Sequence, residues 1–234
     1  MIYSQKKEEF TTKFGPIFTQ LLLADEINRS PAKVQAALLE AMAERQVTIG
    51  DETHKLTSPF VVLATQNPIE QEGTYTLPEA QLDRFMMKVF VDYPSLEAEK
   101  NILTLESGTF QKIESILTSD DLNKSRKYIE SVYVDPKVND YIVRCVTATR
   151  PSSSLFLSKF DGAITAGASP RASLWLNKLS RFNAFINNKE FVTPEDVIKY
   201  IPFVLGHRVI LSYEAQVDNM NSRDITAEIA NTLV

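Results

Sequence analysis

The first third of the chain alternates short apolar runs with one amphipathic segment. The apolar runs at residues 17–24 and 60–65 are continuous enough to predict strands that are covered on both faces. Between them, apolar residues recur at helical spacing over 31–45, directly after Ser30 and Pro31. A serine suits the position before a helix and a proline suits its first residue, so the pattern predicts a helix there.

Shorter patterns follow in the same part of the chain. The runs at 46–49 and 53–56 flank a Gly-Asp pair, which is typical of a hairpin. Residues 78–83 predict a short helix, and the apolar run at 87–91 predicts a third strand. Strand and helix signals that alternate in this way indicate an α/β layer.

Beyond residue 94 the strand signals fade and helical periodicity dominates. Helices are predicted at residues 95–106, 119–131, 136–149, 171–187 and 194–201. We therefore expect an α/β unit over residues 1–93, followed by an all-helical unit over 94–234.

Composition and charge exclude several classes of protein. The 25 basic and 30 acidic residues give a net charge of −5, which argues against nucleic acid as a partner. One cysteine allows no intrachain disulfide and no Cys-rich zinc site. No run reaches the roughly 18 apolar residues that a membrane span needs, and the N-terminus lacks the apolar core of a secretory signal. We expect a cytoplasmic protein without membrane insertion.

Polar side chains stand at the ends of the first two predicted strands of the α/β layer, at 17–24 and 60–65. Asp25 and Glu26 directly follow the first strand, and Asn67 follows the second. An acid at such a strand end can hold Mg²⁺, a second acid can orient an attacking water, and an amide can contact a phosphate oxygen. The same residues could equally cap the next helix, face solvent or form an ordinary loop.

Two arginines lie at predicted helix ends. Arg84 follows a short helix, where it could simply complement the negative end of the helix or could project towards a partner subunit's nucleotide. Arg171 lies at the start of a helix, which is unfavourable for a cation and so suggests a function, although solvent screening keeps the cost small.

Several segments resemble the MoxR branch of the AAA+ ATPases over about residues 2–215. The segment LLLADEINR at 21–29 resembles the Walker B motif, and GASPRA at 167–172 resembles sensor 2. Further similar segments are sensor 1 and its following loop at 64–75, the arginine-finger segment at 77–85 and the lid at 204–215. Residues 2–14 are similar to the family's insert hairpin.

This resemblance implies a role for each candidate residue. Asp25 would hold Mg²⁺ and Glu26 would activate water. Asn67 would contact the γ-phosphate or that water. Arg84 would reach the neighbouring protomer's site, and Arg171 would contact the nucleotide from the lid. ATP and Mg²⁺ are therefore the implied cofactors, and the chemistry is phosphoryl transfer by positioning and charge neutralisation.

One family motif has no counterpart in the chain. Walker A ends in a Gly-Lys pair, and none of the seven glycines here is followed by lysine. The implied fold is a partial AAA+ parallel-sheet core without its P-loop strand and helix, followed by an all-helical lid domain. We therefore expect this chain alone to bind ATP weakly or not at all.

The resemblance also implies a function and partners. The family's ATPases act as rings, usually hexamers, that remodel or mature client proteins, often with von Willebrand factor A domains. A non-catalytic module that assembles with ATPase subunits is one alternative. A magnesium-chelatase-like subunit is another, although residues 71–75 favour the MoxR branch.

Overall fold

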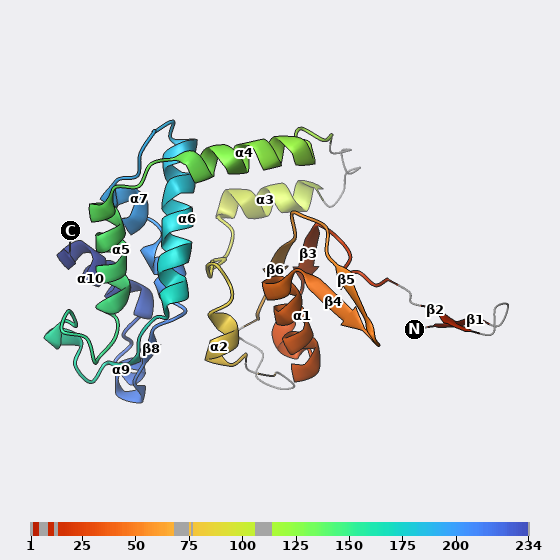
Figure 1. The fold of residues 1–234 in the computed structure, drawn as a ribbon. Helices are drawn as coiled ribbons and strands as arrows, with labels where there is room; N and C mark the ends of the chain where they lie inside the picture. Colours follow the sequence, from red (N-terminus) through yellow and green to blue (C-terminus); the bar gives the residue numbers. More distant parts are fainter. Residues whose placement is uncertain are drawn as a thin grey trace. The chain divides into compact units, whose positions relative to one another are not determined.

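The computed structural model describes residues 2–4, 9–11, 14–67, 75, 77–105 and 114–233. They belong to two compact units, Met1–Arg84 and Phe85–Val234 (Figure 1). An α/β unit followed by a mainly helical unit is the architecture that the sequence predicts.

The first unit contains a parallel pair of strands joined through a helix and a hairpin. Its elements are β3 (Leu21–Ala24), the single turn η1 (Ile27–Arg29), α1 (Ala32–Glu44), β4 (Gln46–Ile49), β5 (Glu52–Lys55), β6 (Val61–Ala64) and α2 (Glu79–Leu82). Strands β3 and β6 run parallel, with Leu21 beside Val61 and Ala24 beside Ala64. The predicted strands, helices and hairpin of this region are present, but the strand expected over 17–24 covers only Leu21–Ala24, and α1 begins one residue later than expected. Strands β1 (Ile2–Ser4) and β2 (Glu9–Thr11) pair antiparallel, with Ile2 beside Thr11.

Only one face of the parallel pair is covered by residues that the structure describes. On that face Leu22 and Val62 pack against Ala41, Leu56 and Phe60. Side chains alternate between the two faces of a strand, so the residues on either side of Leu22 and Val62 point the opposite way. Those neighbours are largely exposed: Leu21 at 61%, Leu23 at 62%, Val61 at 47% and Leu63 at 54%. The expectation of cover on both faces is therefore wrong for this part of the chain.

The second unit is built mainly from helices. They are α3 (Leu96–Leu105), α4 (Ser119–Ser131), α5 (Pro136–Thr147), α6 (Pro170–Ile186), α7 (Pro194–Ile198), α8 (Ile201–Leu205), α9 (Tyr213–Val217) and α10 (Ser222–Leu233). The five predicted helical regions are confirmed; the last, predicted over 194–201, corresponds to α7, while α8 begins only at its final residue and was not predicted as a separate helix. The sequence did not predict α9, α10, the single turn η2 (Ser158–Phe160) or the short antiparallel pair of β7 (Ile164–Ala166) and β8 (Ile210–Leu211).

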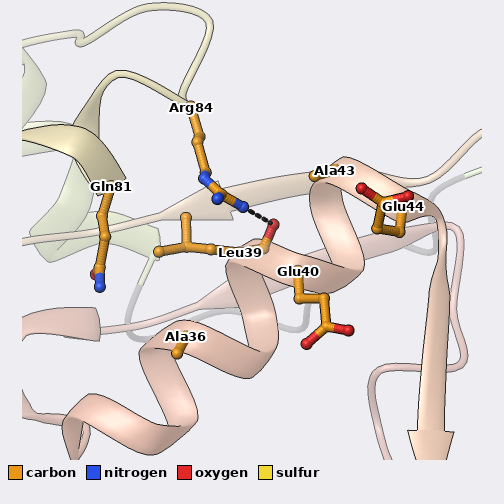
Figure 2. Close-up of a pocket in the computed structure, with 7 residues that line it drawn as sticks. All are labelled: Ala36, Leu39, Glu40, Ala43, Glu44, Gln81 and Arg84. Atoms are coloured by element: carbon orange, nitrogen blue, oxygen red, sulfur yellow. Dashed lines mark hydrogen bonds between the residues drawn. The ribbon is translucent and has the colours of Figure 1, made fainter.

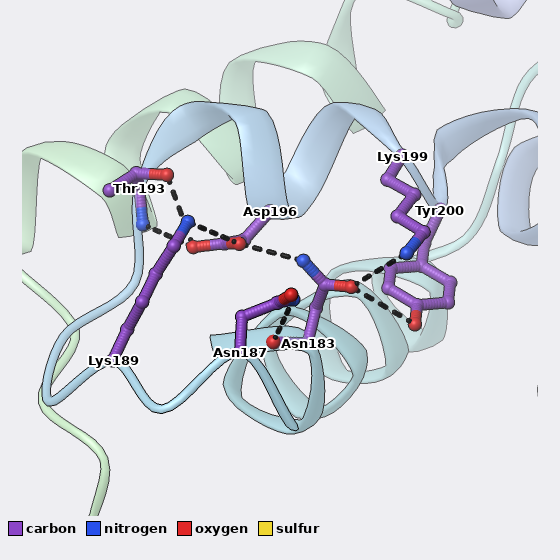
Figure 3. Close-up of polar contacts among 7 residues, drawn as sticks. All are labelled: Asn183, Asn187, Lys189, Thr193, Asp196, Lys199 and Tyr200. Carbon is purple, nitrogen blue, oxygen red and sulfur yellow. Dashed lines mark hydrogen bonds and ion pairs between the residues drawn. The ribbon is translucent and has the colours of Figure 1, made fainter. Parts of the chain in front are cut away.

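A buried carboxylate links α6 to α7 inside this helical unit. Asp196 is 1% exposed and accepts hydrogen bonds from the Asn183 amide at 2.7 Å, the Lys189 ammonium at 2.9 Å and the Thr193 backbone N–H at 2.9 Å (Figure 3). Burial alone would raise the pKa of Asp196, but these hydrogen bonds outweigh it and hold the pKa below its usual range. The network satisfies a charge that would otherwise destabilise the core.

The predicted strand at 87–91 is wrong, because the backbone of this segment and of the two residues before it bonds to α8 and to the Arg208 side chain instead of to another strand. The Lys88 N–H donates to the Phe203 carbonyl of α8 at 3.0 Å. The Arg208 guanidinium donates to the carbonyls of Phe85 and Met86. A strand needs a neighbouring strand for these groups, and the described residues provide none beside this segment.

Among the described residues, no helix combines the length and the apolar character that crossing a bilayer requires.

Candidate nucleotide-binding site

The carboxyl ends of β3 and β6 bring Asp25 and Thr65 side by side. The register that pairs Ala24 with Ala64 continues one residue further, since the Thr65 N–H donates to the Ala24 carbonyl at 3.1 Å. The Thr65 hydroxyl donates to Asp25 Oδ1 at 2.6 Å and accepts the Glu26 N–H at 2.8 Å. The Ile27 N–H then donates to the Thr65 carbonyl at 3.0 Å. Thr65 therefore contacts each residue of the turn that carries the two acids.

Glu26 has an unusual backbone conformation at this turn. Its φ of 49° and ψ of 51° lie in the left-handed region, which is uncommon for a residue with a side chain. Its carboxylate forms an ion pair with Arg29, with 3.2 Å between Oε2 and the guanidinium NH1. Both side chains remain more than a third exposed, so the glutamate is accessible to water.

A buried glutamine anchors the loops behind the two acids. The Gln35 amide is 1% exposed and donates to the carbonyls of Ile27 at 3.1 Å and Tyr75 at 3.3 Å. The Asn28 amide donates to the Asn67 carbonyl at 3.4 Å. These bonds hold the end of β6, with Asn67, against the turn that carries the acids.

The residues at this edge carry donor atoms that suit a magnesium ion. Asp25 is exposed, and in the described part of the chain its second carboxylate oxygen receives no hydrogen bond. Carboxylate oxygens are ligands that Mg²⁺ prefers. No cluster of three or more His, Cys, Asp or Glu side chains occurs within the described ranges. Phosphate oxygens and water would therefore supply the remaining ligands, as is common for Mg²⁺.

Arg84 lies at a separate cleft between α1 and the end of α2. The cleft has a volume of about 410 Å³, and Figure 2 shows the Arg84 guanidinium above α1. Its NH1 donates to the Leu39 carbonyl at 3.2 Å, and Glu40 and Glu44 line the same cleft. The arginine is exposed, so its present contact leaves it accessible from solvent.

Arg171 is the second residue of α6 in the helical unit. The Ser169 hydroxyl caps this helix by accepting the Arg171 N–H at 3.2 Å. The preceding Ala168 is held on both sides, because its N–H donates to the Thr149 hydroxyl at 2.9 Å and its carbonyl accepts from Arg150 at 3.0 Å. The helix start that carries Arg171 is thus fixed to the end of α5.

Sequence reasoning singled out Asp25 and Glu26 but missed Thr65 and Gln35. The position of Thr65 follows only once the register of the two strands is known, because pairing Leu21–Ala24 with Val61–Ala64 places Thr65 beside Asp25. Gln35 gave no signal, since a glutamine on a helix is normally exposed.

Comparison with known proteins agrees with this geometry. The model of the ATPase family associated with various cellular activities (AAA) matches residues 1–87, and the AAA lid domain model matches residues 160–229. Chaperone MoxR1 of Mycobacterium tuberculosis is 45% identical over 232 residues, which is 99% of this chain. The chain belongs to the MoxR family of AAA+ ATPases. The partial AAA+ core and helical lid that the sequence predicted are thereby confirmed.

Two further proteins are similar to this chain over nearly its whole length. The uncharacterised protein YeaC of Bacillus subtilis is 39% identical over 234 residues, and the chain covers 70% of it. A crystal structure of a candidate ATPase from Cytophaga hutchinsonii is 45% identical, with a TM-score of 0.92 over 99% of this chain and 71% of that one. The chain spans 62% of the length of MoxR1.

Proposed function

We propose that this MoxR-family chain is part of an ATPase that uses Mg²⁺-dependent ATP hydrolysis to remodel or mature partner proteins. The observation that carries the proposal is the pair of accessible acids, Asp25 and Glu26, at the carboxyl edge of a parallel pair of strands. Ligands of open α/β sheets bind at this edge. The similarity to MoxR1, which is named a chaperone, supports the client-directed role.

Each candidate residue has a role in this proposal. Mg²⁺, when bound at Asp25, would neutralise charge on the phosphates. Glu26 orients the attacking water and accepts its proton, while Asn67 contacts that water or the γ-phosphate. Arg84 stabilises developing charge in the neighbouring protomer's site, and Arg171 contacts the nucleotide of its own protomer.

The assembly and setting belong to the same proposal. We propose a homo-oligomeric ring, with six subunits, that acts in the cytoplasm on protein clients such as von Willebrand factor A domain proteins. The exposed position of Arg84 supports a contact between subunits. The net charge of −5 supports protein clients over nucleic acid. We also propose domains spanning residues 1–93 and 94–234.

A substitution at Glu26 tests hydrolysis. In a version of the protein that carries a Walker A segment, Glu26→Gln should lower the rate of ATP hydrolysis by about 10²-fold or more and spare nucleotide binding, because only the base is lost. An unchanged rate would remove Glu26 from the mechanism.

A mixing experiment tests Arg84 in the same version of the protein. Arg84→Ala should be inactive alone and partly rescued by mixing with Glu26→Gln subunits, since the two changes then affect different sites. Lack of rescue would contradict a role for Arg84 across the subunit interface.

A non-catalytic role remains the second candidate, and one observation favours it. No glycine in the 234 residues precedes a lysine, so the phosphate cradle is not within this sequence. We expect the purified chain to show little or no binding of a fluorescent ATP analogue in Mg²⁺, measured by anisotropy. Tight Mg²⁺-dependent binding would overturn this expectation.

A further inference from the structure

We propose that Thr65 is a positioning residue that fixes the orientation of the Asp25 carboxylate and the backbone of Glu26 relative to each other. The inference rests on the proposed function, because it concerns how the metal-holding acid and the catalytic base are held. In this proposal Thr65 acts through its contacts with the two acids and does not itself touch the reacting atoms.

The hydroxyl of Thr65 uses both of its hydrogen-bonding capacities at this turn. Its proton goes to Asp25 Oδ1 at 2.6 Å, and its oxygen accepts the Glu26 N–H at 2.8 Å. A short O–H···O bond to an ionised acid is among the stronger hydrogen bonds in proteins. This bond orients the Asp25 carboxylate and leaves its other oxygen for a metal ion.

The backbone of Thr65 restrains the same turn from the other side. Its N–H donates to the Ala24 carbonyl at 3.1 Å, and its carbonyl accepts the Ile27 N–H at 3.0 Å. Glu26 stands between these two contacts with a φ of 49°. A left-handed residue with a side chain persists only where its surroundings hold it, and here the contacts to Thr65 supply that restraint.

Few side chains can replace this hydroxyl. Valine has nearly the same shape as threonine but neither donates nor accepts. Serine retains both capacities on a smaller side chain. Comparing Thr65→Val with Thr65→Ser therefore separates the effect of losing the hydrogen bonds from the effect of losing the packing of the methyl group. Thr53→Val is a matched control, because the Thr53 hydroxyl is exposed on the hairpin and pairs with that of Thr48.

Amide hydrogen exchange of the 234-residue chain tests the restraint directly. Thr65→Val should speed the exchange of the Glu26 amide by about tenfold or more, while the Ile27 amide, which bonds to the Thr65 backbone, stays protected. Thr65→Ser and Thr53→Val should leave both amides unchanged. An unchanged Glu26 amide, or an equal rise at every amide of β3 and β6, would overturn the proposal.

Kinetics in a version that carries a Walker A segment test the link to function. Thr65→Val should raise the Mg²⁺ concentration for half-maximal hydrolysis and lower kcat by about tenfold, with Thr65→Ser close to the unsubstituted protein. In the Glu26→Gln background Thr65→Val should lower kcat little further. A fall in kcat without any change in Mg²⁺ dependence would overturn the role at Asp25. If the unsubstituted protein did not hydrolyse ATP, the proposed function would fail, and the exchange result would still decide whether Thr65 holds the turn.

Discussion

At the scale of single residues, hydrogen bonds decide which polar groups can be even partly buried. His207 in the helical unit illustrates this. Its Nδ1 lies 3.1 Å from the Phe203 carbonyl and its Nε2 lies 2.8 Å from Arg208 NH1. The neutral ring with its proton on Nδ1 satisfies both contacts, because Nε2 then accepts from the guanidinium. Burial and the neighbouring Arg208 charge lower the pKa of His207 to about 4.

This shift predicts a pH dependence of stability. The folded pKa lies below the unfolded value of 6.5, so the unfolded chain binds more protons between these values and stability falls as the pH drops through this window. The loss between pH 7 and pH 5 should be at most about 2 kcal/mol. Urea unfolding at several pH values measures it.

A variant in which glutamine replaces His207 is the control for this titration. His207→Gln retains an acceptor for Arg208 but does not titrate, so its stability should change less over the same range. The carboxyls of Asp121 and Asp196, whose pKa values are lowered, lose their contribution only at more acidic pH. Equal pH dependence in both proteins would contradict the assignment to His207.

At the scale of elements, close backbone approach fixes how α6 begins. A Cβ added at Gly167 would lie 2.4 Å from the Thr149 carbonyl oxygen and 2.7 Å from the Arg150 nitrogen. Both of these atoms are backbone at the end of α5 and cannot rotate away. Glycine at this position therefore lets the end of α5 hold the start of the helix that carries Arg171.

Gly167→Ala should accordingly destabilise the helical unit. Steric displacement of this kind typically costs about 1–3 kcal/mol, which corresponds to several degrees in melting temperature. Differential scanning calorimetry measures the change. Gly15→Ala is the control, because nothing lies within 4 Å of a Cβ there, and a similar loss in both variants would argue against the contact with Thr149.

At the scale of the whole molecule, the first unit presents an apolar face on β3 and β6 that no described residue covers. Strands of parallel sheets are normally covered on both faces. The exposed positions Leu21, Leu23, Val61 and Leu63 alternate with the buried-face positions, so they form one contiguous patch. Contiguous apolar surface of this kind promotes association or binding of apolar dyes.

We therefore expect the chain to bind the apolar dye ANS through this face. Leu23→Lys together with Leu63→Glu should reduce dye fluorescence severalfold and lessen association in light scattering, because charges replace the centre of the patch. The double variant Leu103→Lys and Leu174→Lys, at exposed positions of helices, is the control. Equal reduction by the control would show that the dye binds elsewhere.

The sequence by itself determined the order and type of most elements, because apolar periodicity and helix-start residues act locally. It also identified Asp25, Glu26, Asn67, Arg84 and Arg171 as candidates. Tertiary structure alone decided that the Lys88 N–H pairs with the Phe203 carbonyl of a helix rather than with a strand, and that Arg208 binds the carbonyls of the preceding Phe85 and Met86. It also decided that Thr65 joins the two acids across 40 residues of chain. The reason is that a hydrogen-bond partner distant in the sequence is selected only when the chain folds, and local patterns contain no information about it.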